Sequence, residues 1–310
     1  MPSLSPGQRH RATCVFKGIM KLYGMLIAKN EGDIIEQTFL SLKKFGGFEK
    51  VFFYDNGSSD NTLDIARKFN DFVTCIDVSN KPYSDTLKYE LLYSQAHTYA
   101  NGDWMAILDA DELYAESLLP KIDFAERHGA NCIEAKSAQF YLTEKDNASI
   151  FDPSIEAIKQ RKHYLINYGE PRLFKYSDAL KLNDKLVKSR DGVLVSSAEK
   201  LLINHFQYRS SPQLQTRIAV RRANNPSSGN WYHVDSERWE DYLMRSKYLH
   251  EFDGTFKYGL PEEANLYKIE NNIAYTNTTL KWLARNNYFQ QRELDFLEAG
   301  RFKRVLKKFF

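Results

Sequence analysis

Residues 102–114 read GDWMAILDADELY, a short apolar run followed directly by acidic residues. Every residue of 104–108 is apolar, which is typical of a strand buried on both faces. Asp109, Asp111 and Glu112 follow at its carboxyl end, which in an open α/β sheet faces the crevice where ligands bind. Two carboxylates separated by one residue suit a hard divalent cation that also holds phosphate oxygens, although an ordinary polar turn can have the same sequence.

The composition is that of a globular protein. The chain has 310 residues, of which 43% are hydrophobic and 14% aromatic, enough to bury a core in one large domain or two small ones. The net charge of +3 is too small to indicate nucleic acid as the main partner. No run of about 18 apolar residues predicts a membrane span. The cysteines are sparse and the N-terminus lacks the apolar segment of a signal peptide, so we expect a cytoplasmic protein.

Apolar and amphipathic segments alternate along the first part of the chain. Apolar runs at residues 22–28, 51–54, 72–78 and 104–108 predict strands, and the segments between them predict helices. This alternation predicts an α/β fold with a mostly parallel sheet and helices on both faces. Polar loops follow the first, second and fourth strands, so we expect these loops to converge at one edge of the sheet. The loops are Lys29-Asn30-Glu31, Asp55-Asn56-Gly57-Ser58 and Asp109-Ala110-Asp111-Glu112.

Three motifs at these strand ends resemble those of a known enzyme family. They are AKNEG at residues 28–32, YDNGSSDNT at residues 54–62 and GDWMAILDADE at residues 102–112. In this order, the motifs resemble the family 2 glycosyltransferases of the GT-A fold, and in particular the branch that builds bacterial surface polysaccharides. The resemblance is specific over residues 20–115 and weak afterwards.

The resemblance implies an inverting, metal-dependent enzyme of cell-surface polysaccharide or lipopolysaccharide synthesis. Its donor would be a nucleotide-diphospho-sugar, in the first place a UDP-sugar, and its acceptor a saccharide or a lipid-linked saccharide. The implied catalytic domain covers residues 20–225, with a nucleotide-sugar half at 20–115 and an acceptor half at 116–225. Residues 1–19 lack periodicity and are expected to be a disordered extension, whereas residues 226–310 are expected to be mainly helical.

The same resemblance assigns the residues of the donor site. Asn30 and Glu31 match positions that line the nucleotide pocket, and Asp55 matches the acid that contacts the base of the donor. Asp109 and Asp111 match the Asp-x-Asp pair, both at the implied metal site. The first of these usually reaches the ribose, and the second holds Mn²⁺ or Mg²⁺ on the diphosphate.

Several basic side chains are further candidates for the same site. Lys88 lies near a basic position that many members use beside the nucleotide, although a lysine on a solvated helix face is ordinary. His205, in the element HFQYRS, is a candidate third metal ligand or diphosphate contact, and a structural role fits it as well. Arg209 can add charge near the phosphates, and so can three arginines that follow it, although these are expected to be solvated: Arg217, Arg221 and Arg222.

The reaction itself requires a base. Negative charge grows on the leaving diphosphate, where a divalent ion can neutralise it, and an inverting transfer also needs a carboxylate that takes the proton of the acceptor hydroxyl. Glu170 is our choice, because the glycine and proline of residues 168–172 predict a fixed turn near the site. A surface glutamate paired with Arg172 would fit the same sequence. The other acids considered are Glu134 and Glu144.

Residues 301–310, RFKRVLKKFF, predict a basic amphipathic helix. Its apolar residues recur at helical spacing, with basic residues and no acid between them. Such a helix can lie on an anionic membrane surface, which would suit a peripheral enzyme on the cytoplasmic face with a lipid-linked acceptor. Docking of its apolar side on the domain fits equally well.

Two other classes of function remain open. A haloacid dehalogenase-like phosphatase also carries Asp-x-Asp after a buried strand, with the first aspartate as nucleophile. That family usually places the motif after its first strand and has threonine or valine where this chain has Leu113. A non-catalytic nucleotide-sugar binding module would lack only the base or the acceptor site, so donor hydrolysis or transfer distinguishes it from an enzyme.

Overall fold

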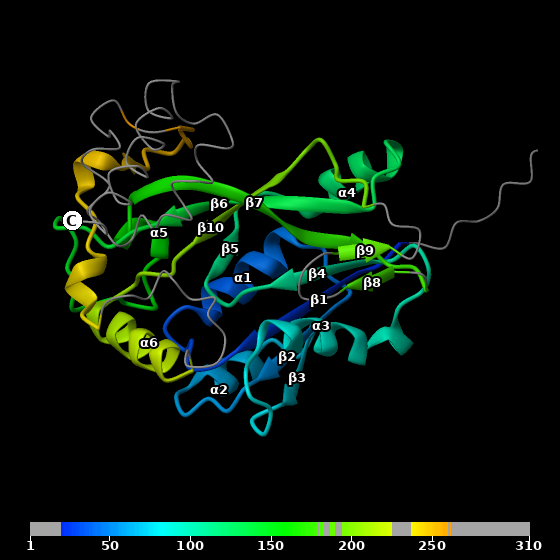
Figure 1. Ribbon diagram of the computed structural model, residues 1–310, viewed down its shortest axis with the longest axis horizontal. Helices are drawn as coiled ribbons and strands as arrows, with labels where there is room; N and C mark the ends of the chain where they lie inside the picture. Colours follow the sequence, from blue (N-terminus) through cyan, green and yellow to red (C-terminus); the bar gives the residue numbers. More distant parts are fainter. Residues whose placement is uncertain are drawn as a thin grey trace, which may run out of the picture.

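A mixed β-sheet with helices on both faces organises the chain (Figure 1). The computed structural model describes residues 20–178, 180–182, 187–189, 194–224, 237–259 and 261. The strand order is β3-β2-β1-β4-β7-β6-β10-β5, with β11 paired to β7, and β8 and β9 form a separate pair. The strands are β1 (Leu22–Ala28), β2 (Lys50–Asp55), β3 (Val73–Asp77), β4 (Trp104–Leu108), β5 (Glu112–Tyr114), β6 (Cys132–Phe140), β7 (His163–Lys175), β8 (Leu180–Leu182), β9 (Val187–Ser189), β10 (Leu201–His205) and β11 (His250–Glu251). The helices are α1 (Ile35–Phe45), α2 (Thr62–Arg67), α3 (Asp85–Ser94), α4 (Leu118–Arg127), α5 (Ala157–Gln160) and α6 (Ser211–Asn224), with the 3-10 helices η1 (Ala96–Thr98), η3 (Trp239–Tyr242) and η4 (Ser246–Tyr248).

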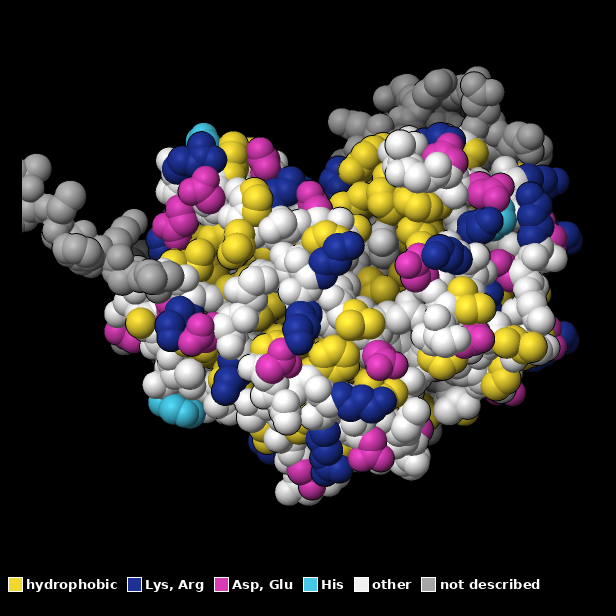
Figure 2. All heavy atoms as spheres, turned by 180° about the vertical axis from the view of Figure 1, so that it is seen from behind, with side chains coloured by type: hydrophobic (Ala, Val, Ile, Leu, Met, Phe, Trp, Pro, Cys, Tyr) yellow, Lys and Arg dark blue, Asp and Glu magenta, His cyan; other side chains and the backbone are white. Residues whose placement is uncertain are grey.

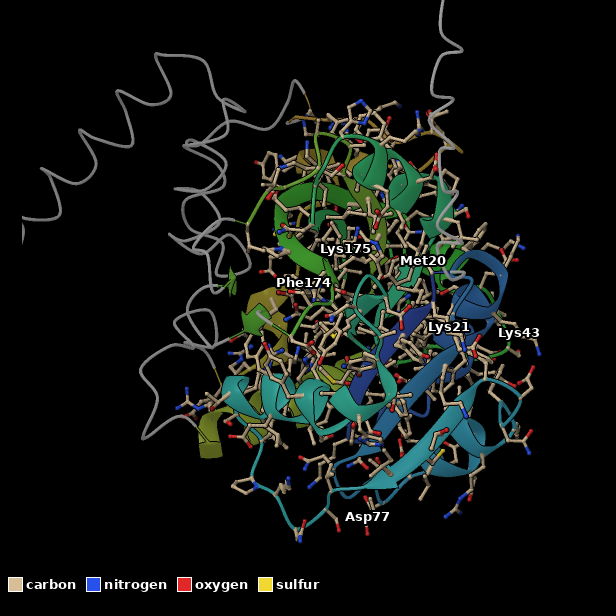
Figure 3. The ribbon with its side chains drawn as sticks, turned by 90° about the vertical axis from the view of Figure 1, so that its right-hand side faces the viewer. Met20, Lys21, Lys43, Asp77, Phe174 and Lys175 are labelled. Atoms are coloured by element: carbon tan, nitrogen blue, oxygen red, sulfur yellow. The ribbon has the colours of Figure 1, made fainter. Side chains whose placement is uncertain are left out.

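The half of the sheet built from β1 to β4 is parallel, as the alternation of strands and helices predicts. β1 pairs with β2 on one side and β4 on the other, and β3 follows β2 at the edge, where Figure 3 shows Asp77 at its end. Successive side chains of β1 face opposite sides of the sheet. Leu26 therefore packs with α1, α2 and α4, whereas Met25 packs with α3. Because both faces are covered, every residue of β1 is buried.

The other half of the sheet is mixed. β7 runs antiparallel to both β4 and β6, β10 runs parallel to β6, and β5 runs antiparallel to β10. The connection from β6 to β7 carries only the short α5, whose 4 residues make about 6 Å of helix. A helix of this length cannot cover a sheet face as a parallel crossover does. The parallel arrangement is therefore confined to β3-β2-β1-β4 and to the β6–β10 pair.

β7 shows that the predicted turn at residues 168–172 is wrong. The whole segment lies inside this 13-residue strand. Ile133 of β6 pairs with Leu173, and Glu134 pairs with Pro171, so Arg172 is an extra residue on β7 at a β-bulge. A bulge accommodates a proline, which cannot donate to the ladder, and it redirects the neighbouring side chain.

Some predictions lie outside the described residues. These are the disordered extension at 1–19, the amphipathic tail at 301–310 and most of the helical region at 226–310. The described part of that last region contains η3, η4 and β11, and β11 pairs with β7. In the ranges given above, no helix combines the length and the apolar character that a membrane crossing needs. On the face seen in Figure 2, basic and acidic side chains are interspersed.

Candidate active site

The loops after β1 and β2 are joined to each other by hydrogen bonds. The Asn30 backbone N–H donates to Ser58 Oγ at 3.0 Å, and the Ser59 N–H donates to Asn30 Oδ1 at 2.7 Å. Asn30 has a φ of 56°, a left-handed conformation in which asparagine is enriched. The Glu31 N–H donates to Thr62 Oγ1 at 2.8 Å. These bonds hold the AKNEG and DNGSSDNT motifs against each other at one edge of the sheet.

Asp55 lies buried at the end of β2 and shapes the loop that follows it. Its carboxylate oxygens accept the Ser58 N–H at 3.3 and 3.2 Å. The buried side chain of Asn56 donates through Nδ2 to the backbone oxygens of Val78 and Lys81, at 3.0 and 2.8 Å. The motif therefore has a structural function, and the contact of Asp55 with a nucleotide base stays a prediction.

Asp109 lies between two cations from other elements. Lys88 of α3 contacts its Oδ1 at 2.5 Å, and Nη1 of Arg172, at the β7 bulge, contacts its Oδ2 at 2.9 Å. Burial alone would raise the pKa of Asp109, but these cations outweigh burial and hold the pKa well below its ordinary value. Nη2 of the same Arg172 contacts Glu112 Oε1 at 2.6 Å, so one guanidinium bridges two carboxylates of the β4 loop.

Asp111 is also buried, and its contacts come from the later part of the chain. Arg217 Nη1 of α6 lies 2.8 Å from Asp111 Oδ2, and His205 Nε2, at the end of β10, lies 3.4 Å from Oδ1. Burial would raise the pKa of Asp111, but His205 and Arg217 hold it well below its ordinary value. The structure thus brings His205 and Arg217 beside Asp111. The role of His205 as a metal ligand or diphosphate contact stays a prediction.

Arg209 serves as an internal link between distant parts of the chain. Its side chain is fully buried and pairs with Glu31 Oε2 and Asp33 Oδ2, while its Nη1 donates to the Phe206 carbonyl at 3.0 Å. Asp111 Oδ2 lies farther away, at 3.8 Å. The charge of Arg209 is therefore balanced mainly by the two acids of the loop after β1. Glu31, predicted to line the nucleotide pocket, is held by its ion pair with Arg209, and burial raises the pKa of Glu31.

The expectation of a solvated basic helix is wrong for Arg217 and Arg221. The Arg217 side chain is 20% exposed and contacts Asp111. Burial and the charge of Arg217 lower the pKa of Arg221 to about 10. The signal that could have revealed this is the helical spacing: these arginines share one face of α6 with the buried Leu214 and Ile218. Arg222 points away and pairs with Glu237, with 38% of its side chain exposed.

Two glutamates near Arg172 differ in their surroundings, and Glu170 has the alternative arrangement of a surface glutamate paired with Arg172. Glu112, which sequence reasoning placed only in the loop, is buried, and burial raises its pKa to about 7 against the charge of Arg172. Glu170, the predicted base, has a side chain that is 48% exposed and lies 3.5 Å from Arg172 Nη2. Of the other acids considered, Glu134 pairs with Lys200 and Glu144 accepts the Ser246 N–H.

The donor set fits a cation that is shared with a ligand. Within the described ranges, no group of three or more histidine, cysteine, aspartate or glutamate side chains is arranged to hold a metal ion by itself. The Asp111 carboxylate and the His205 imidazole nevertheless converge at 3.4 Å. Mg²⁺ commonly uses one or two carboxylates, with substrate phosphates and water completing its coordination. The residues present can therefore hold a divalent cation together with a diphosphate.

Comparison with known proteins gives one family and several distant structures. The model of glycosyl transferase family 2 matches residues 25–169. TarS from S. aureus, solved as residues 1–349 with UDP-GlcNAc, is 20% identical, with a TM-score of 0.34, over 39% of this chain and 35% of that one. The mannosyltransferase PcManGT from Pyrobaculum calidifontis, solved with GDP-Man and Mn²⁺, is 13% identical, with a TM-score of 0.38, over 67% of this chain and 66% of that one. Glucosyl-3-phosphoglycerate synthase from Mycobacterium tuberculosis, solved with Mn²⁺ and UDP-glucose, is 21% identical, with a TM-score of 0.27, over 39% of this chain and 44% of that one. No curated protein sequence matches the chain.

Proposed function

We propose that this protein transfers a sugar from a nucleotide-diphospho-sugar to a hydroxyl acceptor, because the model of glycosyl transferase family 2 matches residues 25–169. The acceptor class we propose is a saccharide or a lipid-linked saccharide, in the synthesis of cell-surface polysaccharide or lipopolysaccharide. A UDP-sugar is the first donor to test. The transfer is proposed to be inverting, with Glu170 as the base.

The observation that carries this proposal is the paired arrangement of acids and cations at the end of β4. Asp109 and Asp111 lie beside Lys88, Arg172 and Arg217, which come from three other elements. A leaving nucleoside diphosphate gains negative charge in the transition state, and preorganised cations stabilise such charge without reorganisation. The carboxylates meanwhile offer acceptors for ribose hydroxyls and ligands for a metal.

We assign the donor contacts by their position around the end of β4. Asp55 is proposed to contact the base, Asn30 and Glu31 to line the nucleotide pocket, and Asp109 to accept from the ribose. Asp111 and His205, with Asp109 nearby, would hold Mn²⁺ or Mg²⁺. When bound, such an ion neutralises charge on the diphosphate. Lys88 would keep Asp109 ionised and oriented.

The position of the Asp-x-Asp motif argues against the phosphatase alternative. That family usually places the motif after its first strand, whereas here it follows β4. The binding-module alternative makes no demand on this position. It is distinguished by turnover, because a module binds nucleotide sugars without hydrolysing or transferring them.

The decisive experiment combines a binding screen with turnover. Nucleotide sugars are tested with and without Mn²⁺ by thermal shift, since a ligand that binds the native state raises the unfolding midpoint. Donor hydrolysis and transfer are then measured for the parent, Asp111→Asn and Asp109→Asn. We expect Asp111→Asn to lower the rate by about a thousandfold with the fold intact, and Asp109→Asn to act more on donor affinity.

A matched control is Asp71→Asn. Asp71 pairs with Lys43 on an exposed surface, before the amino end of β3 and hence at the opposite edge of the sheet. It should keep parental turnover. A folded Asp111→Asn protein with near-parental, metal-independent turnover would rule out the assigned donor site, and binding of donors without any turnover would favour the binding module.

A further inference from the structure

Asp111 is contacted by three basic side chains that differ in how firmly they are held. His205 lies 3.4 Å from Oδ1, whereas Arg217 and Arg209 approach Oδ2 at 2.8 and 3.8 Å. A divalent cation at Oδ2 competes with the two arginines, because a positive ion and a guanidinium on one oxygen repel each other. One guanidinium must therefore leave Oδ2 before a metal can bind there, whereas His205, at Oδ1, would be a second ligand of the metal.

Arg209 is not the group that can leave. Its side chain is fully buried and is held by Glu31, Asp33 and the Phe206 carbonyl. Moving it would take a fully buried guanidinium out of its pocket of partners and leave two partly buried carboxylates without their counter-charge, which is unfavourable.

Arg217 is held much less firmly. Besides Asp111, it donates to the Gln207 carbonyl at 3.4 Å, a long and weak hydrogen bond, and 20% of its side chain is exposed. It extends from α6, a helix of 14 residues that can stay in place while the long side chain changes rotamer.

We propose that Arg217 is an exchangeable counter-ion: it pairs with Asp111 in the ligand-free protein and moves to the diphosphate of the donor when Asp111 becomes a metal ligand. Arg221, one turn further along the same face of α6, extends this anion site. The proposal rests on the proposed function, because it takes a nucleoside diphosphate as the incoming anion. In the exchange, Arg217 gains one anionic partner as it loses another, so no buried charge is left unpaired.

The charge around α6 supports this arrangement. Burial disfavours the charged form of Arg217, but Asp111 and Glu31 together raise its pKa. Arg221 lies one turn further along α6, and burial and the charge of Arg217 lower its pKa to about 10. An anion near both guanidinium groups would reduce their mutual repulsion.

The exchange predicts that metal and diphosphate help each other to bind. Mn²⁺ alone must displace Arg217 without offering it a new partner, whereas Mn²⁺ with a nucleoside diphosphate supplies both halves of the exchange. By linkage, each ligand should tighten the other by the same factor. Removing the guanidinium should relieve the competition at Asp111 and weaken the mutual effect at the same time.

The test measures Mn²⁺ affinity by electron paramagnetic resonance of the free ion, first alone and then with UDP, GDP, ADP or dTDP. We expect Arg217→Gln to bind Mn²⁺ alone about tenfold more tightly than the parent, the scale of one charged hydrogen bond. In the same variant, the factor by which a nucleoside diphosphate raises the affinity for Mn²⁺ should fall by about tenfold or more. Arg217→Lys, which keeps the charge, should retain the weak binding of Mn²⁺ alone.

Arg222→Gln is the matched control. Arg222 lies in the same helix, five residues after Arg217, and forms an exposed ion pair with Glu237. The variant should match the parent within about twofold in both measurements. Circular dichroism and unfolding midpoints confirm that each variant is folded, and Arg217→Met, which also removes the guanidinium, carries the same expectations if Arg217→Gln is not.

The outcomes separate this inference from the proposed function. If Arg217→Gln binds Mn²⁺ alone no more tightly than Arg222→Gln and keeps the parental coupling, Arg217 is a fixed structural partner of Asp111 and the inference is wrong. If no nucleoside diphosphate raises the affinity of the parent for Mn²⁺, the binding of diphosphate by Arg217 is wrong, and so is the proposed function.

Discussion

Arg172 links two carboxylates of the site from one place in the sheet. The bulge on β7 inserts it between Pro171 and Leu173, and its two terminal nitrogens then reach Asp109 and Glu112. A planar guanidinium with its fork of donors can bridge two carboxylates in a way that an ammonium group cannot. The position of this one residue therefore fixes the relative orientation of the acids that follow β4.

Glu170, two residues before Arg172, is where the predicted base can be tested. Glu170→Gln should lower kcat by about a hundredfold to ten-thousandfold, because it removes proton transfer from the acceptor hydroxyl. Stability should change by no more than about 0.5 kcal/mol, as is usual for surface substitutions. The measurement is transfer under saturating donor, beside urea unfolding.

Glu134→Gln is the control for that prediction. Glu134 is another glutamate of the same sheet region and pairs with Lys200 at 2.5 Å. It should keep parental kcat. Parental kcat in Glu170→Gln would assign Glu170 an ion-pair role with Arg172 and place the base elsewhere.

At the scale of elements, the strands that carry the site were predictable and the later ones only in part. The apolar runs predicted at 22–28 and 104–108 are the strands Leu22–Ala28 and Trp104–Leu108, because a strand covered on both faces must be apolar throughout. The segment of β7 was predicted as strand and loop, because its glycine and proline are typical of turns, whereas here the proline sits at a bulge.

The inward face of α6 escaped prediction for a different reason. Arginine on a helix usually indicates solvent, and only the helical spacing with Leu214 and Ile218 marks Arg217 and Arg221 as facing the protein. Their acidic partner Asp111 lies about a hundred residues earlier, so no local pattern reveals the pair. For the same reason, the network around Arg209 could not be read from the sequence.

Gly24 of β1 lies close to a side chain of β4, so a substitution at Gly24 tests how tightly the two strands pack. A Cβ at Gly24 would lie 2.6 Å from Leu108 Cδ1 and 3.1 Å from Val51 Cγ2, both in buried side chains. Gly24→Ala should therefore destabilise the protein by about 1–3 kcal/mol through overpacking. Urea unfolding monitored by circular dichroism measures the change.

A double-mutant cycle identifies the cause of that loss. Leu108→Val shortens the side chain that crowds Gly24, so Leu108→Val should cost less in the Gly24→Ala protein than in the parent. Unfolding free energies that simply add, or an unaltered stability of Gly24→Ala, would contradict the packing argument.

At the scale of the whole molecule, the tail at residues 301–310 concerns where the enzyme works. It carries five basic residues and no acid: Arg301, Lys303, Arg304, Lys307 and Lys308. Reversing the charge of Lys307 and Lys308 to glutamate should weaken binding to vesicles that contain phosphatidylglycerol by more than about tenfold, since each basic residue contributes about 1 kcal/mol at such a surface. Donor hydrolysis in solution should be unchanged.

Co-sedimentation with vesicles measures that effect, with neutral phosphatidylcholine vesicles as the control. Removal of residues 301–310 should give the same loss of binding. Equal sedimentation of the parent and both variants would refute the membrane role and favour docking of the tail on the protein.

Arg209 connects two segments that are far apart in the sequence, the loop after β1 and the end of β10. Its partners Glu31 and Asp33 precede it by 178 and 176 residues. Arg209→Met should destabilise the protein by about 2–4 kcal/mol, because two partly buried carboxylates lose their counter-charge. Arg222→Met removes an exposed pair from the same part of the chain and should cost no more than about 1 kcal/mol.

The pH dependence of the Arg209→Met defect provides an independent check. Burial already raises the pKa of Glu31 in the folded parent, and loss of Arg209 would raise it further. A carboxyl group whose pKa is higher in the folded than in the unfolded state binds more protons when folded, so stability falls as the pH rises through that interval. The deficit of Arg209→Met against the parent should therefore be largest above the folded pKa of Glu31 and should shrink as the pH falls below it. Urea unfolding of both proteins across a pH series measures this, and a deficit that is constant with pH would show that Arg209 acts through packing rather than through its charge.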